Sequence, residues 1–296
     1  MSLHKTAMAF LDPAPQVSYW QAWSKEMGSW SEPYREIADP YWNWAQRSTP
    51  HSGGSFAWRA VSSVQERATP LQDAQVTSYA VARMAALAKK TTPWALFVGL
   101  HKPHLPFIAP QRHFDRYPLD GIRLAHAPWC PWKLPGLSFS SYELQEFVDV
   151  GSWWQMHGRQ QCDGKSYRRG CSYAPACNET IPDATARQLR RAYYAAVSFA
   201  DELFGRLVAG LKRVGAWDST VVLLWGDHGF KLGEHGGWAK HDNTLVDTRI
   251  PLILRVPSIS GRGVAHGLVE VHADSPPSRR SPVPTISLNL AFRLGY

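Results

Sequence analysis

The stretch that decides the fold is DATARQLRRAYYAAVSFADELFGRLVAGLKRVGAWDSTVVLLW, residues 183–225. Its first part predicts an amphipathic helix, because apolar residues recur at helical spacing: Leu189, Tyr193, Val197, Ala200, Phe204, Leu207 and Leu211. Asp183 or Thr185 can cap the start of this helix, and Gly215 suits its end. Residues 220–225 are continuously apolar and rich in β-branched residues, which is typical of a strand covered on both faces.

A similar unit precedes this stretch. Apolar residues recur at helical spacing from Val76 to Leu87, and after a Thr-Thr-Pro break the apolar run 94–98 predicts a buried strand. A further apolar run covers residues 251–256. Helices that alternate with apolar strands predict an α/β fold, with a mostly parallel sheet flanked by helices. In such sheets the functional site lies beyond the carboxyl ends of the strands.

Three regions differ in character. Residues 1–70 are rich in Trp and Pro without a regular period, and we expect an irregular lead-in. Residues 71–272 carry the helix-and-strand pattern, interrupted by a loop insertion at about 125–181. Residues 273–296 begin with a Ser-, Pro- and Arg-rich run that has little apolar content, and we expect them to be disordered.

Composition limits the partners. The chain has 296 residues, enough for a buried core, and its 32 Lys and Arg exceed its 24 Asp and Glu, giving +8. This excess favours anionic partners such as sulfated or phosphorylated sugars. No block of five or six like charges occurs, so we expect no nucleic-acid partner. No apolar run is long enough for a membrane span, and no signal peptide is recognisable, which leaves the compartment open.

The four cysteines do not have the C-x-x-C spacing of a structural zinc site. Three of them lie close together and would suit one loop disulfide in an oxidising compartment, with the pairing left open: the four are Cys130, Cys162, Cys171 and Cys177.

Polar residues follow the predicted strand 220–225 directly, in Gly-Asp-His-Gly at 226–229. Asp227 supplies a hard oxygen ligand for Ca²⁺ or Mg²⁺, whereas His228 is a less usual ligand for either ion and alternatively binds substrate. The structural alternative is a capping Asp beside a core His.

The strand 94–98 also ends in polar residues, in the sequence GLHKPHLPF at 99–107. Its prolines favour an extended backbone, in which residues three apart point to similar sides, so His101 and His104 are expected to lie together. Alternatively, the segment is a proline-stiffened surface loop. Downstream, the glycine-rich run LGEHGGWAK at 232–240 delivers Lys240, which otherwise is an ordinary surface charge.

These segments resemble sulfatases, most closely the iduronate-2-sulfatase group. The resemblance rests on residues 101–107, 225–240 and 248–253 and extends, in the family's order, from about Leu71 to Val271. It implies part of an alkaline-phosphatase-like α/β domain, with a divalent cation, usually Ca²⁺ and alternatively Mg²⁺, at the carboxyl edge of the sheet.

The resemblance also implies roles for single residues. Asp227 matches a metal ligand, and His228 matches a residue at the metal. Lys240 and His104 match residues that contact the sulfate. Lys240 suits neutralisation of a sulfuryl oxygen, and His104 suits binding of the sulfate or protonation of the departing alcohol.

His101 and Lys102 are additional candidates for binding an anionic substrate. The implied function is hydrolysis of sulfate esters on a sugar or polysaccharide such as a glycosaminoglycan, in a lysosomal or secreted protein. Two alternatives stay open: a phosphoesterase of the same superfamily, and a non-catalytic module that binds sulfated polysaccharide. The oligomeric state is not predicted.

The family's nucleophile has no clear counterpart. Sulfatases use a formylglycine made from Cys or Ser in a Cys/Ser-x-Pro-Ser-Arg motif near the start of the domain, with adjacent aspartates that complete the metal site. This chain has no adjacent aspartates, and no cysteine lies in such a motif. Ser275-Pro-Pro-Ser-Arg279 fits the serine form but lies near the opposite end of the chain, so we interpret it as coincidental. We expect the later part of a catalytic domain, inactive by itself.

Overall fold

The computed structural model describes residues 56–129, 144, 181–240, 243–257 and 263–264. The four cysteines and most of the predicted lead-in, insertion and C-terminal tail lie outside the described residues. The main elements in chain order are β1 (Trp58–Val61), α3 (Ser63–Ala68), α4 (Gln72–Leu87), β2 (Phe107–Pro110), α5 (Gln111–Phe114), α7 (Asp183–Arg213), β3 (Val222–Trp225), β4 (Lys231–Leu232), β5 (Trp238–Ala239), α8 (Leu245–Thr248) and β6 (Leu252–Arg255).

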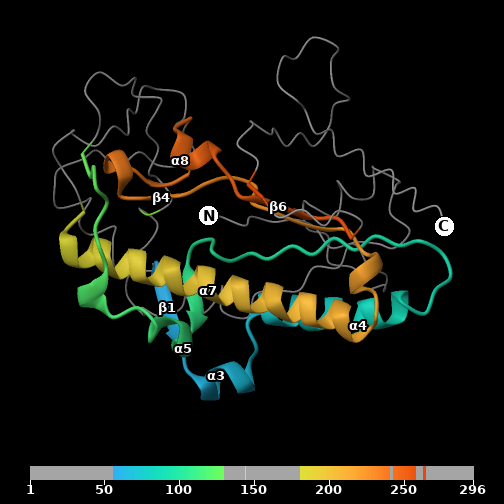
Figure 1. The fold of residues 1–296 in the computed structure, drawn as a ribbon. Helices are drawn as coiled ribbons and strands as arrows, with labels where there is room; N and C mark the ends of the chain where they lie inside the picture. Colours follow the sequence, from blue (N-terminus) through green and yellow to red (C-terminus); the bar gives the residue numbers. More distant parts are fainter. Residues whose placement is uncertain (1–55, 130–143, 145–180, 241–242, 258–262, 265–296) are drawn as a thin grey trace, which may run out of the picture.

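Helices α4 and α7 lie side by side, on one side of β4 and β6 (Figure 1). Both lie where the apolar spacing predicts them. They approach closely at Gly210, where an added Cβ would lie 3.0 Å from Val81 Cγ2. The predicted N-cap is wrong, because α7 begins directly after the extended Pro182 and has no side-chain cap. No helix among the described residues is long and apolar enough to cross a membrane.

The strands form three described pairs. β1 and β2 are parallel, whereas β3 with β6 and β4 with β5 are antiparallel. The mixture of helices and strands confirms the α/β class, but parallel pairing does not predominate among the described strands. The reason lies in the connection between β3 and β6, which contains the β4–β5 hairpin and the four-residue α8 instead of a long crossover helix.

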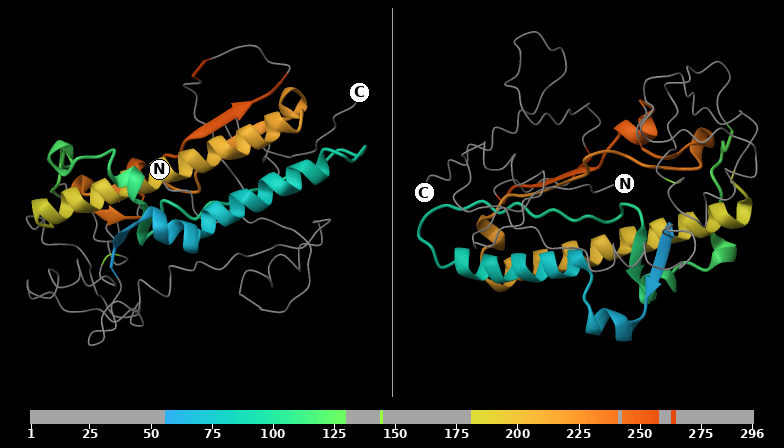
Figure 2. Two further views of the ribbon diagram at one scale, coloured as in Figure 1. Left: turned by 90° about the horizontal axis from the view of Figure 1, so that it is seen from below. Right: turned by 180° about the vertical axis from the view of Figure 1, so that it is seen from behind.

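The run 94–98 is not assigned as a strand. It returns along α4 and α7 beneath β3 and β6 (Figure 2), and with these elements it lines a mainly apolar cavity of about 450 Å³. β3 is half-buried, and on β6 Ile253 and Leu254 are 58% and 51% exposed. Within the described residues, the predicted cover on both faces of these strands is therefore incomplete.

An aromatic cluster joins β2, α7 and the loop after β3. Phe107 is fully buried, and its ring centroid lies 5.5 Å from Tyr193 and 5.8 Å from Phe230. Tyr193 and Phe230 are themselves stacked at 5.3 Å. Burial raises the pKa of the Tyr193 hydroxyl well above its ordinary value. This cluster packs the segment after His104 against the segment after His228.

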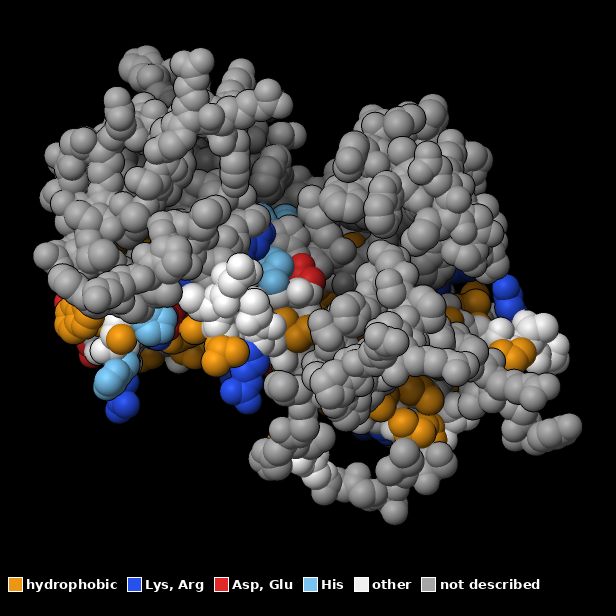
Figure 3. All heavy atoms as spheres, turned by 90° about the horizontal axis from the view of Figure 1, so that it is seen from above, with side chains coloured by type: hydrophobic (Ala, Val, Ile, Leu, Met, Phe, Trp, Pro, Cys, Tyr) orange, Lys and Arg blue, Asp and Glu red, His pale blue; other side chains and the backbone are white. Residues whose placement is uncertain are grey.

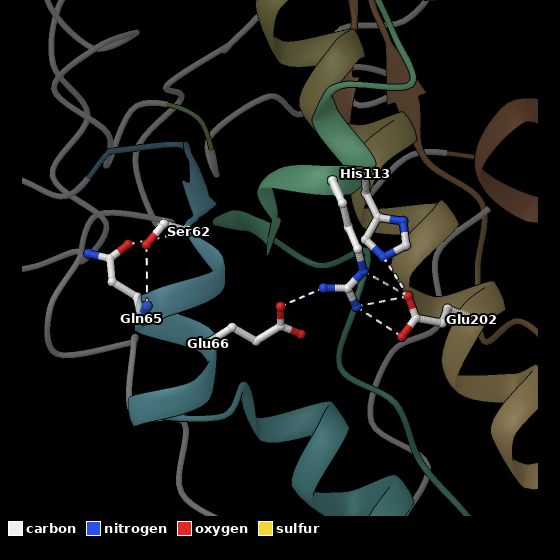
Figure 4. Close-up of polar contacts among 6 residues, drawn as sticks. Ser62, Gln65, Glu66, His113 and Glu202 are labelled. Carbon is white, nitrogen blue, oxygen red and sulfur yellow. Dashed lines mark hydrogen bonds and ion pairs between the residues drawn. The ribbon is translucent and has the colours of Figure 1, made fainter.

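An ionic cluster joins α3, α5 and α7 (Figure 4). Arg112 donates to Glu66 and, through Nη2, to both carboxylate oxygens of Glu202 at 2.9 Å. The buried His113 places Nε2 3.0 Å from Glu202 Oε2. Burial lowers the pKa of His113. Burial by itself would raise the pKa of Glu202, but its contacts with Arg112 and His113 outweigh this effect, so the pKa of Glu202 is lowered. These contacts give the cluster a structural role.

Candidate active site

His101 and His104 lie together as predicted, but on a turn and not on the extended backbone that the prolines were expected to favour. Their rings are stacked with centroids 4.8 Å apart, and the backbone N–H of His104 donates to the carbonyl of His101 at 3.0 Å. Both side chains are partly buried. The peptide bonds before Pro103 and Pro106 are cis. The segment thus forms a compact turn at the end of the run 94–98.

Asp73, in the first turn of α4, holds this turn and was not predicted as a site residue. Its carboxylate accepts from the backbone N–H groups of His101 and Lys102 at 2.9 and 2.8 Å. Lys102 is only 4% exposed, and its ammonium donates to the carbonyls of Pro106 at 2.9 Å and His104 at 3.3 Å. These bonds favour a structural role for Lys102 over its predicted contact with substrate.

The hydrogen bonds of two histidines define their tautomers. His104 Nδ1 contacts the carbonyl of Leu105, and His228 Nδ1 lies 2.7 Å from the carbonyl of Gly229. A carbonyl oxygen only accepts, so each Nδ1 carries the hydrogen, and the neutral ring keeps its lone pair on Nε2. Nε2 is therefore the atom that each ring offers to a metal when the ring is neutral, and to an anion or a departing oxygen when the ring is protonated.

Asp227 and His228 follow β3 directly. Asp227 Oδ1 accepts from the backbone N–H of His228 at 3.0 Å, and Oδ2 lies 3.5 Å from His228 Nε2. Their side chains are 29% and 25% exposed. The loop then packs tightly on α8, because a Cβ at Gly229 would lie 1.8 Å from the carbonyl oxygen of Val246. A residue with a Cβ would therefore prevent the loop from approaching α8 this closely.

Lys240 follows β5 and is only 8% exposed, which argues against an ordinary surface charge. The preceding Ala239 has φ 69°, in the region that disfavours residues with a Cβ. Arg190 of α7 secures the hairpin by donating to the carbonyl of Leu232 at 2.7 Å and to Glu234 Oε1 at 3.0 Å. These contacts with Arg190 hold the hairpin that precedes Lys240 in place.

Lys231 is a second buried cation in this hairpin, and sequence reasoning missed it. It is 1% exposed, and burial lowers the pKa of its ammonium against the opposing effect of Asp247 and Glu234. A Cβ at Gly237 would lie 2.5 Å from Lys231 Cδ, so the glycine leaves room for the lysine side chain. The available sequence signal was a lysine enclosed by Phe230 and Leu232.

One hydrophobic cluster contains residues within two positions of the predicted ones: Leu105 after His104, Phe230 two positions after His228, and Ala239 before Lys240. The three segments therefore pack on the same core. On the face seen from above, histidine, acidic and basic side chains gather near the middle (Figure 3).

The described residues fit only part of a metal site. Ca²⁺ takes six to eight oxygen ligands, whereas Asp227 contributes a single carboxylate and His228 an imidazole. No group of three or more His, Cys, Asp or Glu side chains suited to a metal occurs in the part of the chain that the structure describes. A complete Ca²⁺ site would need further ligands.

Comparisons with known proteins identify the family of this chain. A family model described as Sulfatase matches residues 20–278. Iduronate 2-sulfatase from Homo sapiens is 35% identical over 187 residues, covering 63% of this chain and 31% of that protein. Iduronate 2-sulfatase from Mus musculus is 31% identical over 233 residues, covering 77% of this chain and 39% of that protein.

Among solved structures, the phosphonate monoester hydrolase from Silicibacter pomeroyi has a TM-score of 0.46 and 23% identity, covering 82% of this chain and 42% of that one. The chain spans well under half the length of the two curated relatives, 31% and 39%. Because the family model matches most of its residues, this chain belongs to the sulfatase family.

Proposed function

We propose that this chain forms the anion-binding part of a site that hydrolyses sulfate esters. The observation that carries the proposal is the hydrophobic cluster to which residues within two positions of His104, His228 and Lys240 all belong. Two of these segments supply imidazoles, and the third supplies a buried ammonium. Such groups suit a sulfuryl group whose oxygens and departing alcohol gain negative charge during cleavage.

Each residue has a proposed task. Lys240 binds a sulfuryl oxygen, and its burial strengthens the attraction because less water screens the charge. His104, when protonated on both ring nitrogens, donates through Nε2 to the sulfate or to the departing oxygen. His101 stacks on His104 and binds substrate beside it. Asp227 and His228 contribute to a Ca²⁺ or Mg²⁺ site, but their incomplete ligand set supports no catalytic step through the metal.

The proposed substrate is a sulfated sugar or polysaccharide. The net charge of +8 favours an anionic substrate, and two relatives are named iduronate 2-sulfatase. Because the chain spans 31% and 39% of those relatives, we propose this activity for the complete catalytic domain, with the described residues as its binding part.

A titration with inorganic sulfate, followed by histidine side-chain NMR shifts, tests the proposal. The expected result is binding that shifts His104 and weakens by about tenfold in Lys240→Met, because a lost charge-assisted hydrogen bond typically costs about 1.5–3 kcal/mol. Lys212→Met is the matched control, since Lys212 is exposed near the end of α7 and should leave sulfate affinity unchanged.

Parallel titrations with phosphate and with a heparin-like polymer separate the alternatives. Clearly tighter binding of phosphate at His104 would favour a phosphoesterase. Polymer binding that persists in Lys240→Met, together with no shift of His104 by sulfate, would favour a non-catalytic polysaccharide-binding surface and contradict the proposed site.

A further inference from the structure

The turn that carries His101 and His104 depends on the buried carboxylate of Asp73. We propose that Asp73 is a positioning residue, which holds the turn so that His104 Nδ1 donates to the carbonyl of Leu105 and Nε2, when protonated, meets the bound anion. This inference rests on the proposed function for its anion but on the described contacts for its geometry. Asp73 is 2% exposed and lies 28 residues before His101 in the sequence.

The carboxylate of Asp73 suits this position for two reasons. Each of its oxygens accepts one backbone N–H, that of His101 at 2.9 Å and that of Lys102 at 2.8 Å. The side chain also lies in the first turn of α4, where the helix dipole favours negative charge. Both oxygens of the buried carboxylate thus accept a hydrogen bond at the start of the turn.

Lys102 holds the second half of the turn. The buried ammonium of Lys102 donates to the carbonyls of His104 and Pro106, and the N–H of His104 donates to the carbonyl of His101. Asp73 therefore holds the start of the turn, and Lys102 holds the part of the turn that carries His104. Neither side chain needs to contact substrate to influence the histidine.

This bracing determines which nitrogen of His104 is available. The backbone position brings Nδ1 to the carbonyl of Leu105 and places the ring on that of His101. Nδ1 is then the protonated nitrogen of the neutral ring, and Nε2 is the nitrogen that gains a proton when the ring becomes positively charged. If the turn loosens, the bond to Leu105 is weakened, and both tautomers become populated.

Histidine ¹⁵N NMR of the full 296-residue chain, at a pH where His104 is neutral, tests this role. The wild type should show protonated Nδ1 at His104. Asp73→Asn should give averaged tautomer shifts, because the amide keeps one acceptor and points N–H donors at a backbone N–H. At a lower pH, where the His104 ring is protonated, this variant should bind inorganic sulfate about tenfold more weakly. Lys102→Met should move the same shifts in the same direction.

Two controls separate positioning from general stability. Asp183→Asn changes an acid in the first turn of α7 whose side chain is 68% exposed, and it should leave His104 unchanged. Glu202→Gln weakens the ionic cluster elsewhere in the fold and should lower the melting temperature without changing the tautomer. A folded Asp73→Asn with wild-type tautomer shifts would overturn the proposal. Wild-type protein that lacks sulfate binding but shows these tautomer shifts would instead count against the proposed function alone.

Discussion

The chain is expected to hydrolyse an aryl sulfate no faster than a protein-free control, and Ser275→Ala should change nothing. Lys240 and His104 can stabilise developing charge, but the covalent route through a formylglycine needs a Cys/Ser-x-Pro-Ser-Arg motif in the family's position. Losing a catalytic nucleophile commonly costs several orders of magnitude in rate. Release of the phenol product by the purified chain is the measurement.

The serine form of the motif at Ser275 makes this prediction falsifiable. The string Ser-Pro-Pro-Ser-Arg is followed by Arg-Ser-Pro, and it comes after the segments that supply His104, Asp227 and Lys240. Turnover that requires both Ser275 and Lys240 would mean that this chain contains its own nucleophile. Turnover that survives Ser275→Ala would point to a different, unidentified nucleophile. Either result would contradict the prediction.

Phe107→Ala is expected to lower the free energy of unfolding by about 3–5 kcal/mol, as is usual for a fully buried aromatic side chain. Phe107 packs on Tyr193 and Phe230, so its loss opens a cavity between α7 and the loop that carries Asp227 and His228. Urea denaturation measures the change, and sulfate titration of the folded variant should show weaker binding because two site segments lose their common support.

The control for this variant is Phe56→Ala. Phe56 is 39% exposed, so the same substitution should cost much less there. Equal losses in the two variants would show that the aromatic cluster has no special role in the fold. A large loss at Phe107 with unchanged sulfate affinity would show that the cluster stabilises the protein without organising the site.

The helices were predictable from the sequence because their burial repeats every three to four residues. The period predicted where α4 and α7 lie but not where they begin, because α4 starts at Gln72, before Val76, and α7 starts without the predicted cap. The positions of β3 and β6 were also predictable, since each is a short apolar run. Their antiparallel pairing was not, because pairing depends on the path of the chain between Trp225 and Leu252, and apolar content does not determine that path.

The part of the site that was predictable depends on residues close together in the sequence. The spacing predicted that His101 and His104 lie together, and their rings are stacked. The expected extended backbone was wrong, because the segment forms a turn that is held by bonds from Asp73 and Lys102. Asp73 could not be identified, because an acid at the start of a helix is ordinary and its partners lie far along the chain. Lys231 was not identified either, because its apolar neighbours Phe230 and Leu232 are only a weak signal against the surface position that is usual for a lysine.

The most direct test of a shared site is a double-mutant cycle for sulfate affinity with His104→Ala and Lys240→Met. Residues that contact one ligand normally show coupling of about 0.5–3 kcal/mol, whereas residues more than about 10 Å apart without shared partners are additive within about 0.5 kcal/mol. We predict that each single variant weakens binding and that the double variant loses less than the sum. Fully additive losses, or no loss in either single variant, would contradict the convergence of His104 and Lys240 on one sulfate.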